Sequence, residues 1–265
     1  MPQHAGPLSD SRTATQIHYV RNATWSFIVF VAAYGLVFVP EYFDLYITRA
    51  VNGLVSKNLI IDRVFFHLDK SFIFSGVLLA ALIWGLWFSD VTTDIRTRLL
   101  VGTLVSFPAG IISRFLQHKL PTHPRPLYDP ALEFHTSAAF GPFPLNTWNS
   151  FPSDHVAVFA GLVTTIYLTN RKVGAAAICW TVLVESSRTY VGAHYPSDLI
   201  GGAALAAFIV WAAQAPLVLG TVRPILDWER QNPFAFYVCA FLLTYQIATL
   251  FIDVRDMTGG FSLFS

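Results

Sequence analysis

The stretch SSRTYVGAHYPSDLIGGAALAA, from Ser186 to Ala207, passes from a polar segment into a run of small apolar residues. Pro196 suits the first turn of a helix, and the residues after it can continue as an apolar helix. Glycine and alanine at this density let membrane helices approach one another closely. The stretch therefore predicts a membrane helix whose entry carries ionisable side chains.

The rest of the chain repeats this apolar pattern. Of its 265 residues, 54% are hydrophobic and 12% are charged, whereas soluble domains carry roughly 25% charged residues. A helix crosses a bilayer with about 20 mostly apolar residues, and two of the seven candidate runs reach that length only if they extend into the motif-bearing ends. The candidates are Trp25–Val39, Phe72–Phe88, Leu99–Leu116, Val156–Thr169, Val173–Val184, Leu199–Val222 and Phe234–Ile252. We expect an all-α fold, a polytopic membrane helix bundle with six core transmembrane helices and a seventh at the C-terminus.

This pattern divides the chain into three parts. Residues 1–22 are expected to form a cytoplasmic N-terminal arm, residues 23–222 a six-helix membrane domain, and residues 223–265 an extra C-terminal transmembrane helix and tail. The first apolar run is predicted to be a retained anchor, because about twenty mainly polar residues precede it and no small-x-small cleavage site follows it. The net charge of +1 gives no indication of a nucleic-acid partner. Cys179 and Cys239 lie in apolar runs and indicate neither a disulfide framework nor a CxxC metal site.

Basic residues in the loops orient the predicted bundle. If the chain starts inside, three cytoplasmic loops carry an excess of arginine and lysine, as the positive-inside rule requires. They contain Arg96, Arg98, Arg171, Lys172, Arg223 and Arg230. The first outer segment alternates acidic and basic residues over 41–70, which suggests an amphipathic helix along the outer surface. With this topology, the clusters RFLQHKLPTHPRP (114–126), FPSDH (151–155) and SSRTYVGAHYPSD (186–198) all lie at the outer ends of spans.

The first two clusters contain groups that bind anions. Lys119 and Arg125 are cations in a segment stiffened by prolines, although such a loop can also simply touch lipid headgroups. Ser153 and Asp154 precede an apolar helix, where they are good N-caps, but the same helix N-terminus presents free N–H groups to an anion. His155 follows in the first turn, and an ionisable residue near membrane depth usually marks function.

The third cluster contains a candidate nucleophile. His194 and Asp198 are four residues apart, so that Asp198 can accept the N–H of His194 and leave the other ring nitrogen as a base or nucleophile. The alternative is a helix cap beside an interfacial histidine. Glu185, three residues before Arg188, either forms an ion pair that positions this arginine or faces the outer interface.

Together the three clusters suit a phosphate group. Cations and amides can hold its oxygens, while one histidine attacks phosphorus and the other protonates the leaving oxygen. A metal site built from His155, His194, Asp154 and Asp198 is the competing hypothesis. It is disfavoured because Lys119, Arg125 and Arg188 would repel a cation.

These residues resemble the membrane branch of the type 2 phosphatidic acid phosphatase family. Its signature has three parts: Lys, six residues, Arg-Pro; then Pro-Ser-Gly-His; then Ser-Arg, five residues, His, three residues, Asp. Here the third part is complete, from Ser187-Arg188 through His194 to Asp198. Two departures occur. Five residues separate Lys119 from Arg125, which moves the expected lysine offset onto His118, and Asp154 stands in place of Gly, a form similar to the bacitracin-resistance-type undecaprenyl pyrophosphate phosphatases.

The resemblance implies a metal-independent mechanism without a cofactor. It assigns catalysis to His194, His155 and Asp198, and phosphate binding to Lys119, Arg125, Ser153, Asp154 and Arg188. His194 would form a phosphohistidine, Asp198 would orient it, and His155 would protonate the leaving group.

The function expected from these residues is that of an integral-membrane lipid phosphatase, with membrane lipids around it. Its expected substrate is a polyprenyl pyrophosphate, foremost undecaprenyl pyrophosphate, at the outer face of a bacterial inner membrane. Two alternatives stay open. One is a phosphatase of another lipid phosphate, such as phosphatidic acid, phosphatidylglycerol phosphate or a lipid A phosphate. The other is a lipid-binding or transport protein without enzymatic activity. The oligomeric state does not follow from the sequence.

Overall fold

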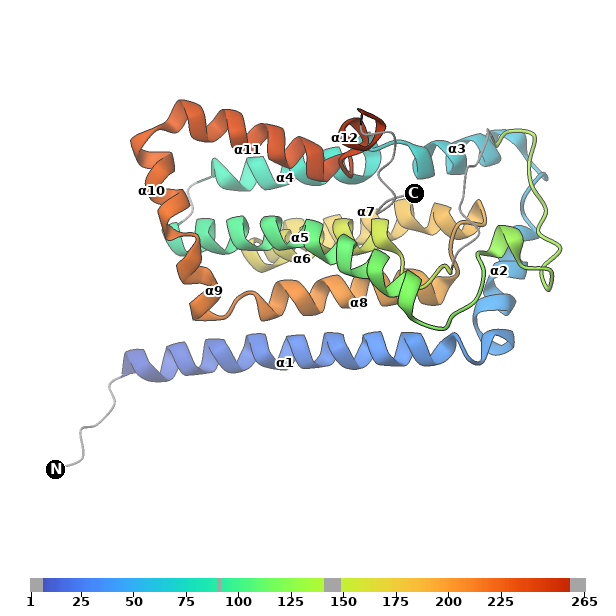
Figure 1. Ribbon diagram of the computed structural model, residues 1–265, viewed down its shortest axis with the longest axis horizontal. Helices are drawn as coiled ribbons and strands as arrows, with labels where there is room; N and C mark the ends of the chain where they lie inside the picture. Colours follow the sequence, from blue (N-terminus) through green and yellow to red (C-terminus); the bar gives the residue numbers. More distant parts are fainter. Residues whose placement is uncertain (1–6, 90–91, 141–148, 258–265) are drawn as a thin grey trace.

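The computed structural model describes residues 7–89, 92–140 and 149–257, and within these residues the chain is helical with no strand. Residues 1–6 and 258–265 of the predicted terminal segments lie outside the described residues. The elements are α1 (Pro7–Leu36), η1 (Pro40–Tyr42), α2 (Asp44–Asn52), α3 (Leu59–Lys70), η2 (Ile73–Val77), α4 (Leu78–Trp87), α5 (Thr93–Lys119), η3 (Pro126–Tyr128), α6 (Asp154–Thr169), α7 (Arg171–Tyr190), α8 (Pro196–Ala212), α9 (Pro216–Thr221), α10 (Arg223–Gln231), α11 (Pro233–Ala248) and α12 (Ile252–Met257). The all-α bundle expected from the apolar runs is confirmed (Figure 1).

Helix α6 lies at the centre of the bundle. It packs against α4, α5, α7 and α8, and most of its residues between Val156 and Ile166 are buried. The largest apolar core cluster joins α6 to α4, α5 and α11. Because the N-terminus of α6 carries the Pro-Ser-Asp-His motif, the motif is attached to the most enclosed helix of the molecule.

The small residues of α8 allow it to pack closely against the segment that precedes α6. A Cβ added at Gly202 would lie 2.4 Å from the backbone oxygen of Ser153, and one at Gly201 would lie 2.4 Å from the ring of Phe151. The amide of Ser153 also donates to the carbonyl oxygen of Asp198 at 3.0 Å. The glycine pair therefore holds the motif before α6 directly against α8.

Among the described residues, α5 by itself is long and apolar enough to cross a membrane. Two bent pairs of helices also pass the same test if each pair is counted as one span, which gives up to three. These are α3 with η2–α4, bent by 65°, and α8 with α9–α10, bent by 71°. The expected single span Leu199–Val222 is thus interrupted: α8 ends at Ala212 and a new helix begins at Pro216, where proline cannot continue the hydrogen bonding of the preceding helix. The predicted number of spans stays a prediction.

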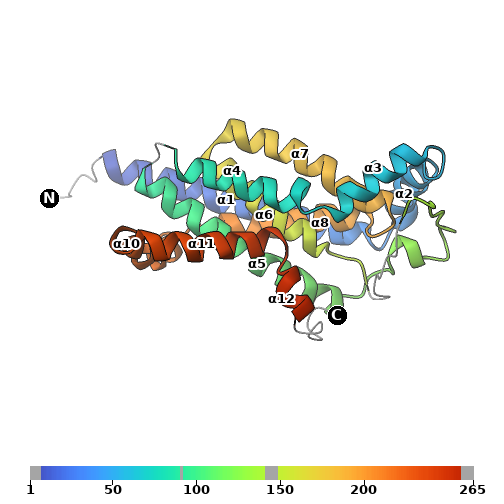
Figure 2. The same ribbon diagram turned by 90° about the horizontal axis from the view of Figure 1, so that it is seen from above.

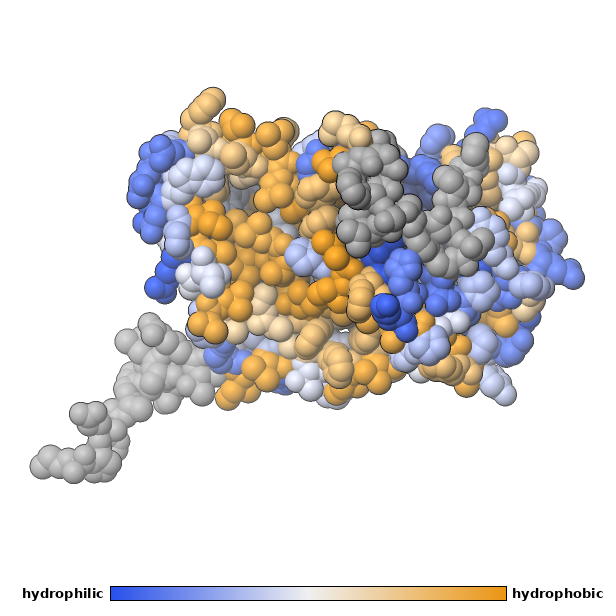
Figure 3. Space-filling view, viewed as in Figure 1, coloured by the Kyte–Doolittle hydropathy of each residue, from blue (hydrophilic) through white to orange (hydrophobic). Residues whose placement is uncertain are grey.

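The surface has the character of a membrane protein. Large apolar side chains are exposed on the outer helices, for example Val182 at 65%, Phe241 at 61% and Leu242 at 55%. Figure 3 shows apolar residues over the middle of one face, with hydrophilic residues gathered toward the ends of the long axis. Such an exposed apolar area is stable when lipid covers it.

The outer segment differs from the surface helix expected over 41–70. It folds as α2 and α3 with a connection, and Asp44 and Asp62 are both fully buried. Asp62 accepts hydrogen bonds from the hydroxyl of Tyr190 at 2.6 Å and from the hydroxyl of Ser137. The acidic side chains therefore point inward and tie α2 and α3 to the end of the bundle.

The division at residue 22 stays a prediction, because α1 runs without a break from Pro7 to Leu36 across that boundary. Helix α1 packs along α8, and both helices run along the long axis (Figures 1 and 2).

Candidate active site

The three polar clusters lie at one end of the bundle. They are carried by the C-terminal end of α5 and the loop after it, the N-terminus of α6, and the connection from α7 to α8 (Figure 1). Neighbouring helices run in opposite directions, so the end of α5, the start of α6, the end of α7 and the start of α8 meet at the same place. This convergence was expected from the alternation of the spans.

His194 is fully buried between a carboxylate and a guanidinium. Its Nδ1 lies 3.3 Å from Oδ2 of Asp198, and its Nε2 lies 3.1 Å from Nη1 of Arg125. A carboxylate only accepts hydrogen bonds and a guanidinium only donates them, which assigns the ring proton to Nδ1 and the lone pair to Nε2. The same Nη1 donates to the carbonyl oxygen of Ala193 at 2.9 Å, so Arg125 is held beside the ring nitrogen that carries the lone pair.

A turn at Gly192 places His194 two residues before the first residue of α8. Gly192 has a φ of +78°, a conformation that favours glycine. The turn is closed by hydrogen bonds from the amides of Ala193 and His194 to the carbonyl oxygen of Arg188, at 2.8 and 3.2 Å. Asp198 accepts from the amide of Tyr195 at 2.8 Å, which fixes its carboxylate in the first turn of α8.

The surroundings keep His194 neutral. Burial, followed by the charges of Arg125 and Arg188, holds the pKa of His194 well below its ordinary value of 6.5. A neutral imidazole with Nδ1 protonated retains a nucleophilic Nε2 at neutral pH.

Asp154 connects a second histidine to an arginine. Its Oδ1 lies 3.0 Å from Nδ1 of His155 and accepts from the amide of the same residue at 2.9 Å. Its Oδ2 lies 3.0 Å from Nη1 of Arg114. Both copies of Pro-Ser-Asp therefore supply a carboxylate to the Nδ1 of a histidine, His155 in the first case and His194 in the second.

Three buried donors lie in this region without a hydrogen-bond partner in the described part of the chain. They are Ser153 Oγ, Arg125 Nε and Arg188 Nε. All three residues are 7% exposed or less, and an unsatisfied buried donor is costly. Arg188 is held on its other side by Asp69, with Nη1 and Oδ1 3.4 Å apart. Buried donors that lack a partner in the protein can bind an anion.

Lys119 is not brought into this cluster. Its side chain is exposed, and its Nζ lies 5.8 Å from the ring centre of Phe115. His118, the other candidate for the family lysine, is also exposed. Arg114, one and a half turns earlier on α5, is the basic residue of this helix that reaches the motif of α6. The assignment of Lys119 to phosphate binding stays a prediction.

Sequence reasoning missed the acidic residues that support the site from outside. Asp69 holds Arg188, while Asp44 accepts from the amide of Ser197 at 2.9 Å and lies 3.6 Å from Nε2 of His123. One signal was available: Asp62, Phe65, Phe66 and Asp69 follow the spacing of a single helix face. Acids that share a face with aromatic residues indicate burial rather than a solvated surface.

The four groups of the competing metal hypothesis form two separate histidine–aspartate pairs. Within the described residues, no group of three or more histidine, cysteine, aspartate or glutamate side chains is arranged to hold a metal ion.

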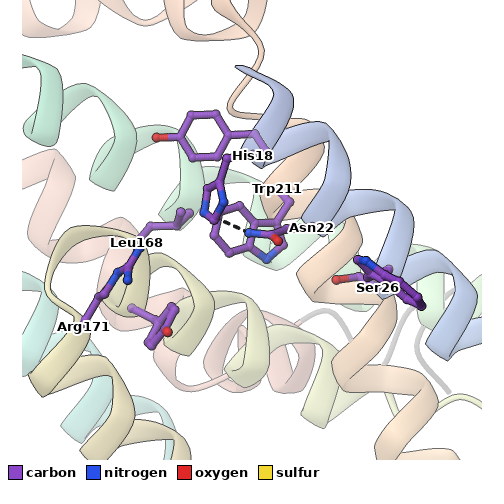
Figure 4. Close-up of a pocket in the computed structure, with 9 residues that line it drawn as sticks. His18, Asn22, Ser26, Leu168, Arg171 and Trp211 are labelled. Atoms are coloured by element: carbon purple, nitrogen blue, oxygen red, sulfur yellow. Dashed lines mark hydrogen bonds between the residues drawn. The ribbon is translucent and has the colours of Figure 1, made fainter. Parts of the chain in front are cut away.

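A cavity of about 500 Å³ lies at the opposite end of the bundle from these pairs (Figure 4). Side chains of α1, α6, α7 and α8 line it, among them His18, Asn22, Arg171 and Trp211, and the pocket contains none of the predicted site residues. His18 and Asn22 are hydrogen-bonded to each other at 3.1 Å.

The chain is similar to three curated proteins. It is 28% identical over 163 residues to undecaprenyl-diphosphatase BcrC of Bacillus subtilis (strain 168), which covers 62% of this chain and 78% of that protein. It is 29% identical over 135 residues to an undecaprenyl-diphosphatase of Sulfolobus acidocaldarius, covering 51% and 61% of the two chains. A 69-residue match at 39% identity to the bacitracin transport permease protein BcrC of Bacillus licheniformis covers 24% of this chain and 34% of that protein. No solved structure matches the chain.

The family model of the PAP2 superfamily matches residues 96–216. This range runs from the first turn of α5 to the start of α9, and therefore contains both histidine–aspartate pairs and all three of the converging clusters. The match to this superfamily and the two relatives named undecaprenyl-diphosphatase indicate that this chain is a phosphatase of the metal-independent kind.

Proposed function

We propose that the protein hydrolyses undecaprenyl pyrophosphate to undecaprenyl phosphate through a phosphohistidine on His194. The observation that carries this proposal is the position of His194 Nε2, which is 3.1 Å from Arg125. The unpartnered donors of Ser153 and Arg188 belong to the same cluster. A phosphate held by these donors would have its phosphorus next to the one ring nitrogen that carries a lone pair.

In the first step, Nε2 of His194 attacks the terminal phosphorus. The N–P bond forms as the bond from phosphorus to the bridging oxygen breaks, and Asp198 stabilises the charge that develops on the imidazole. Arg125 and Arg188 neutralise the equatorial oxygens, which is the largest requirement in phosphoryl transfer.

His155 serves the leaving group. Asp154 accepts from Nδ1 of His155, so when His155 is an imidazolium its opposite ring nitrogen, Nε2, can give its proton to the oxygen of the departing lipid phosphate. The same nitrogen then takes a proton from the water that attacks the phosphohistidine. Water cleaves the N–P bond and releases inorganic phosphate, which restores both histidines.

The substrate assignment rests on two relatives that are named undecaprenyl-diphosphatase. The proposed location is the plasma membrane of a bacterium, with the site facing outward. The basic residues at the other end of the bundle support this orientation, because positively charged loops stay in the cytoplasm.

The test is phosphate release by the purified protein in detergent, with a chelator present. We expect turnover of undecaprenyl pyrophosphate, and a loss of about 10⁴-fold or more for His194→Ala, since a nucleophile cannot be replaced by solvent. Denaturing the enzyme during turnover with terminally ³²P-labelled substrate should trap a label that is stable to base and labile to acid. Wild-type turnover by His194→Ala would rule out the intermediate.

A panel of lipid phosphates assayed side by side tests the substrate. Undecaprenyl pyrophosphate should give the highest kcat/KM. A preference for phosphatidic acid, phosphatidylglycerol phosphate or a lipid A phosphate would retain the phosphatase and replace its substrate. No turnover of any of them would favour a lipid-binding role.

A further inference from the structure

A second cavity begins beside the candidate active site and extends between α6, α7 and α8. Its volume is about 430 Å³, within the range of small-molecule sites. Its lining residues are Val156, Ala160, Val163 and Thr164 of α6, Ile178, Thr181, Val182, Glu185 and Ser186 of α7, and Pro196, Leu199, Ile200, Ala203 and Ala207 of α8. On each helix these positions recur at intervals of three and four, so one face of each helix lines a groove that runs lengthwise.

One end of the groove borders the site through lining residues that are close to site residues in the sequence. Val156 directly follows His155, and Pro196 is two residues after His194. Glu185 lies one helical turn before Arg188. A ligand whose phosphate lies between the two histidines would therefore have its remainder at the entrance of the groove.

The lining suits a hydrocarbon chain. Two of its hydroxyl groups are bonded to the backbone of their own helices, Thr164 to the carbonyl oxygen of Ala160 and Ser186 to that of Leu183, both at 2.7 Å. Such bonds turn the polar atom away from the groove and leave carbon atoms to line it. Apart from Glu185, the lining carries no charged residue.

Glu185 marks the boundary between the polar site and the apolar groove. It is 6% exposed, and its Oε2 has no hydrogen-bond partner in the described residues. Arg188 lies one helical turn from this carboxyl on the side of the site, and the uncharged lining continues on the other side. A phosphate would therefore lie with the arginine and the histidines, and a hydrocarbon chain with the apolar lining.

The groove also opens sideways toward lipid. Ile178 and Val182 on α7 are 40% and 65% exposed, and Ile200 on α8 is 39% exposed. All three line the groove. A lipid in the bilayer can thus enter from the side without passing its tail through water.

We propose that the groove between α6, α7 and α8 binds the isoprenoid chain next to the pyrophosphate and selects substrates by chain length. This inference rests on the proposed function, because it places the tail of the same substrate. Ala203 is about 10 Å along α8 from Pro196, and Ala207 is about 16 Å along it, at 1.5 Å per residue. Substitutions at these two alanines therefore probe the groove at two distances from the site.

The experiment introduces a phenylalanine at each of these two positions. Ala203→Phe fills the part of the groove nearer to the site, and Ala207→Phe fills the part farther from it. Ala176→Phe is the matched control, because Ala176 is an exposed position of α7 outside the lining. Each variant is assayed with isopentenyl, farnesyl and undecaprenyl pyrophosphates, of five, fifteen and fifty-five carbons. Thermal unfolding in detergent checks that each variant is folded.

We expect Ala203→Phe to lower kcat/KM for the two longer substrates by about tenfold or more, a typical effect of blocking an apolar pocket, and to leave the shortest unaffected. Ala207→Phe should impair the undecaprenyl substrate and spare the farnesyl one. The control should match the wild type on all three. Equal losses on every substrate, or none on any, would overturn the proposal.

A binding measurement separates this inference from the proposed catalysis. Undecaprenol carrying a photoreactive group near its alcohol end should cross-link to α6, α7 or α8 in the wild type, with or without His194→Ala, and less in Ala203→Phe. Cross-linking without turnover would refute the phosphatase and retain the groove. Turnover together with cross-links elsewhere would refute the groove and retain the phosphatase.

Discussion

Each histidine of the candidate site has an aspartate on its Nδ1. Asp154 lies 3.0 Å from His155 and Asp198 lies 3.3 Å from His194. From sequence, Asp154 was assigned to phosphate binding, where a negative charge beside a phosphate has no evident use. The structure gives it a physical account, because both its oxygens are engaged, one by His155 and one by Arg114.

This arrangement makes a prediction about coupling. Asp154→Asn should lower kcat by about 10–100-fold, and His155→Ala by about 10²–10⁴-fold, since proton transfer contributes that much. The double variant should be no slower than His155→Ala, because the aspartate acts through the histidine. Glu41→Gln, in an exposed pair with Arg49, is the control. Losses that multiply in the double variant would show that Asp154 acts on the substrate directly.

The pH dependence tests the environment of His194. Its pKa is lowered by burial and then by Arg125, so the neutral nucleophile persists as the pH falls below 6.5 and is lost only on protonation at a lower pH. Arg125→Gln removes one cause, and the acid limb of kcat/KM should move to higher pH by up to about one unit. The substrate titrates identically in both enzymes, so a shift reports the protein. An unmoved acid limb would contradict this assignment.

At the scale of elements, the contact between α8 and the segment before α6 positions the site. Gly202→Ala would place a Cβ 2.4 Å from a backbone oxygen, and overpacking of this kind costs about 1–3 kcal/mol. We expect a lower unfolding temperature and lower activity. Gly85→Ala, where a Cβ meets nothing within 4 Å, should instead leave stability unchanged or raise it by up to about 1 kcal/mol.

The turn between α7 and α8 makes a separate prediction. Gly192 has a positive φ, and an added Cβ would lie 2.8 Å from the ring of Phe134. Gly192→Ala should therefore cost about 1–2 kcal/mol of backbone strain alone and displace His194, measured as lost unfolding temperature and lost turnover. Gly192→Asn separates the two causes, since asparagine tolerates this conformation. If backbone strain dominates, Asn should do less harm than Ala, and if the clash dominates it should do more.

At the scale of the whole molecule, the two ends of the bundle carry different kinds of residue. One end carries the histidines and the buried acids of α2 and α3, and the other carries basic residues and the cavity of Figure 4. Tyr42, 88% exposed, lies at the first end, and Leu217, 85% exposed, lies at the second.

These two positions test the proposed orientation. In a variant without Cys179 and Cys239, both of which are exposed, Tyr42→Cys should react with a membrane-impermeant maleimide in intact cells. Leu217→Cys should react only after the cells are opened, because its end of the bundle is predicted to be cytoplasmic. The reverse pattern would place the site inside.

Much of the site was predictable from sequence because its groups lie close together along the chain. His194 and Asp198 are one helical turn apart, so a local rule relates them. Arg114 and Asp69 were not assigned roles, since their partners Asp154 and Arg188 are far away in sequence and the pairing depends on how α5 and α3 pack. Lys119 resembles the lysine of the motif but lies one residue off its spacing, and the last turn of α5 carries it to the surface.

The sequence by itself determined the all-α class, the apolar character of the helices and the three clusters of ionisable residues, because helix periodicity, composition and capping are local properties. The tertiary structure alone decided which charges meet. It turned Asp44, Asp62 and Asp69 inward, paired Asp154 with Arg114, and opened a groove beside the histidines. The physical reason is that a buried charge needs a partner, and which partner is within reach is set by the packing of distant helices.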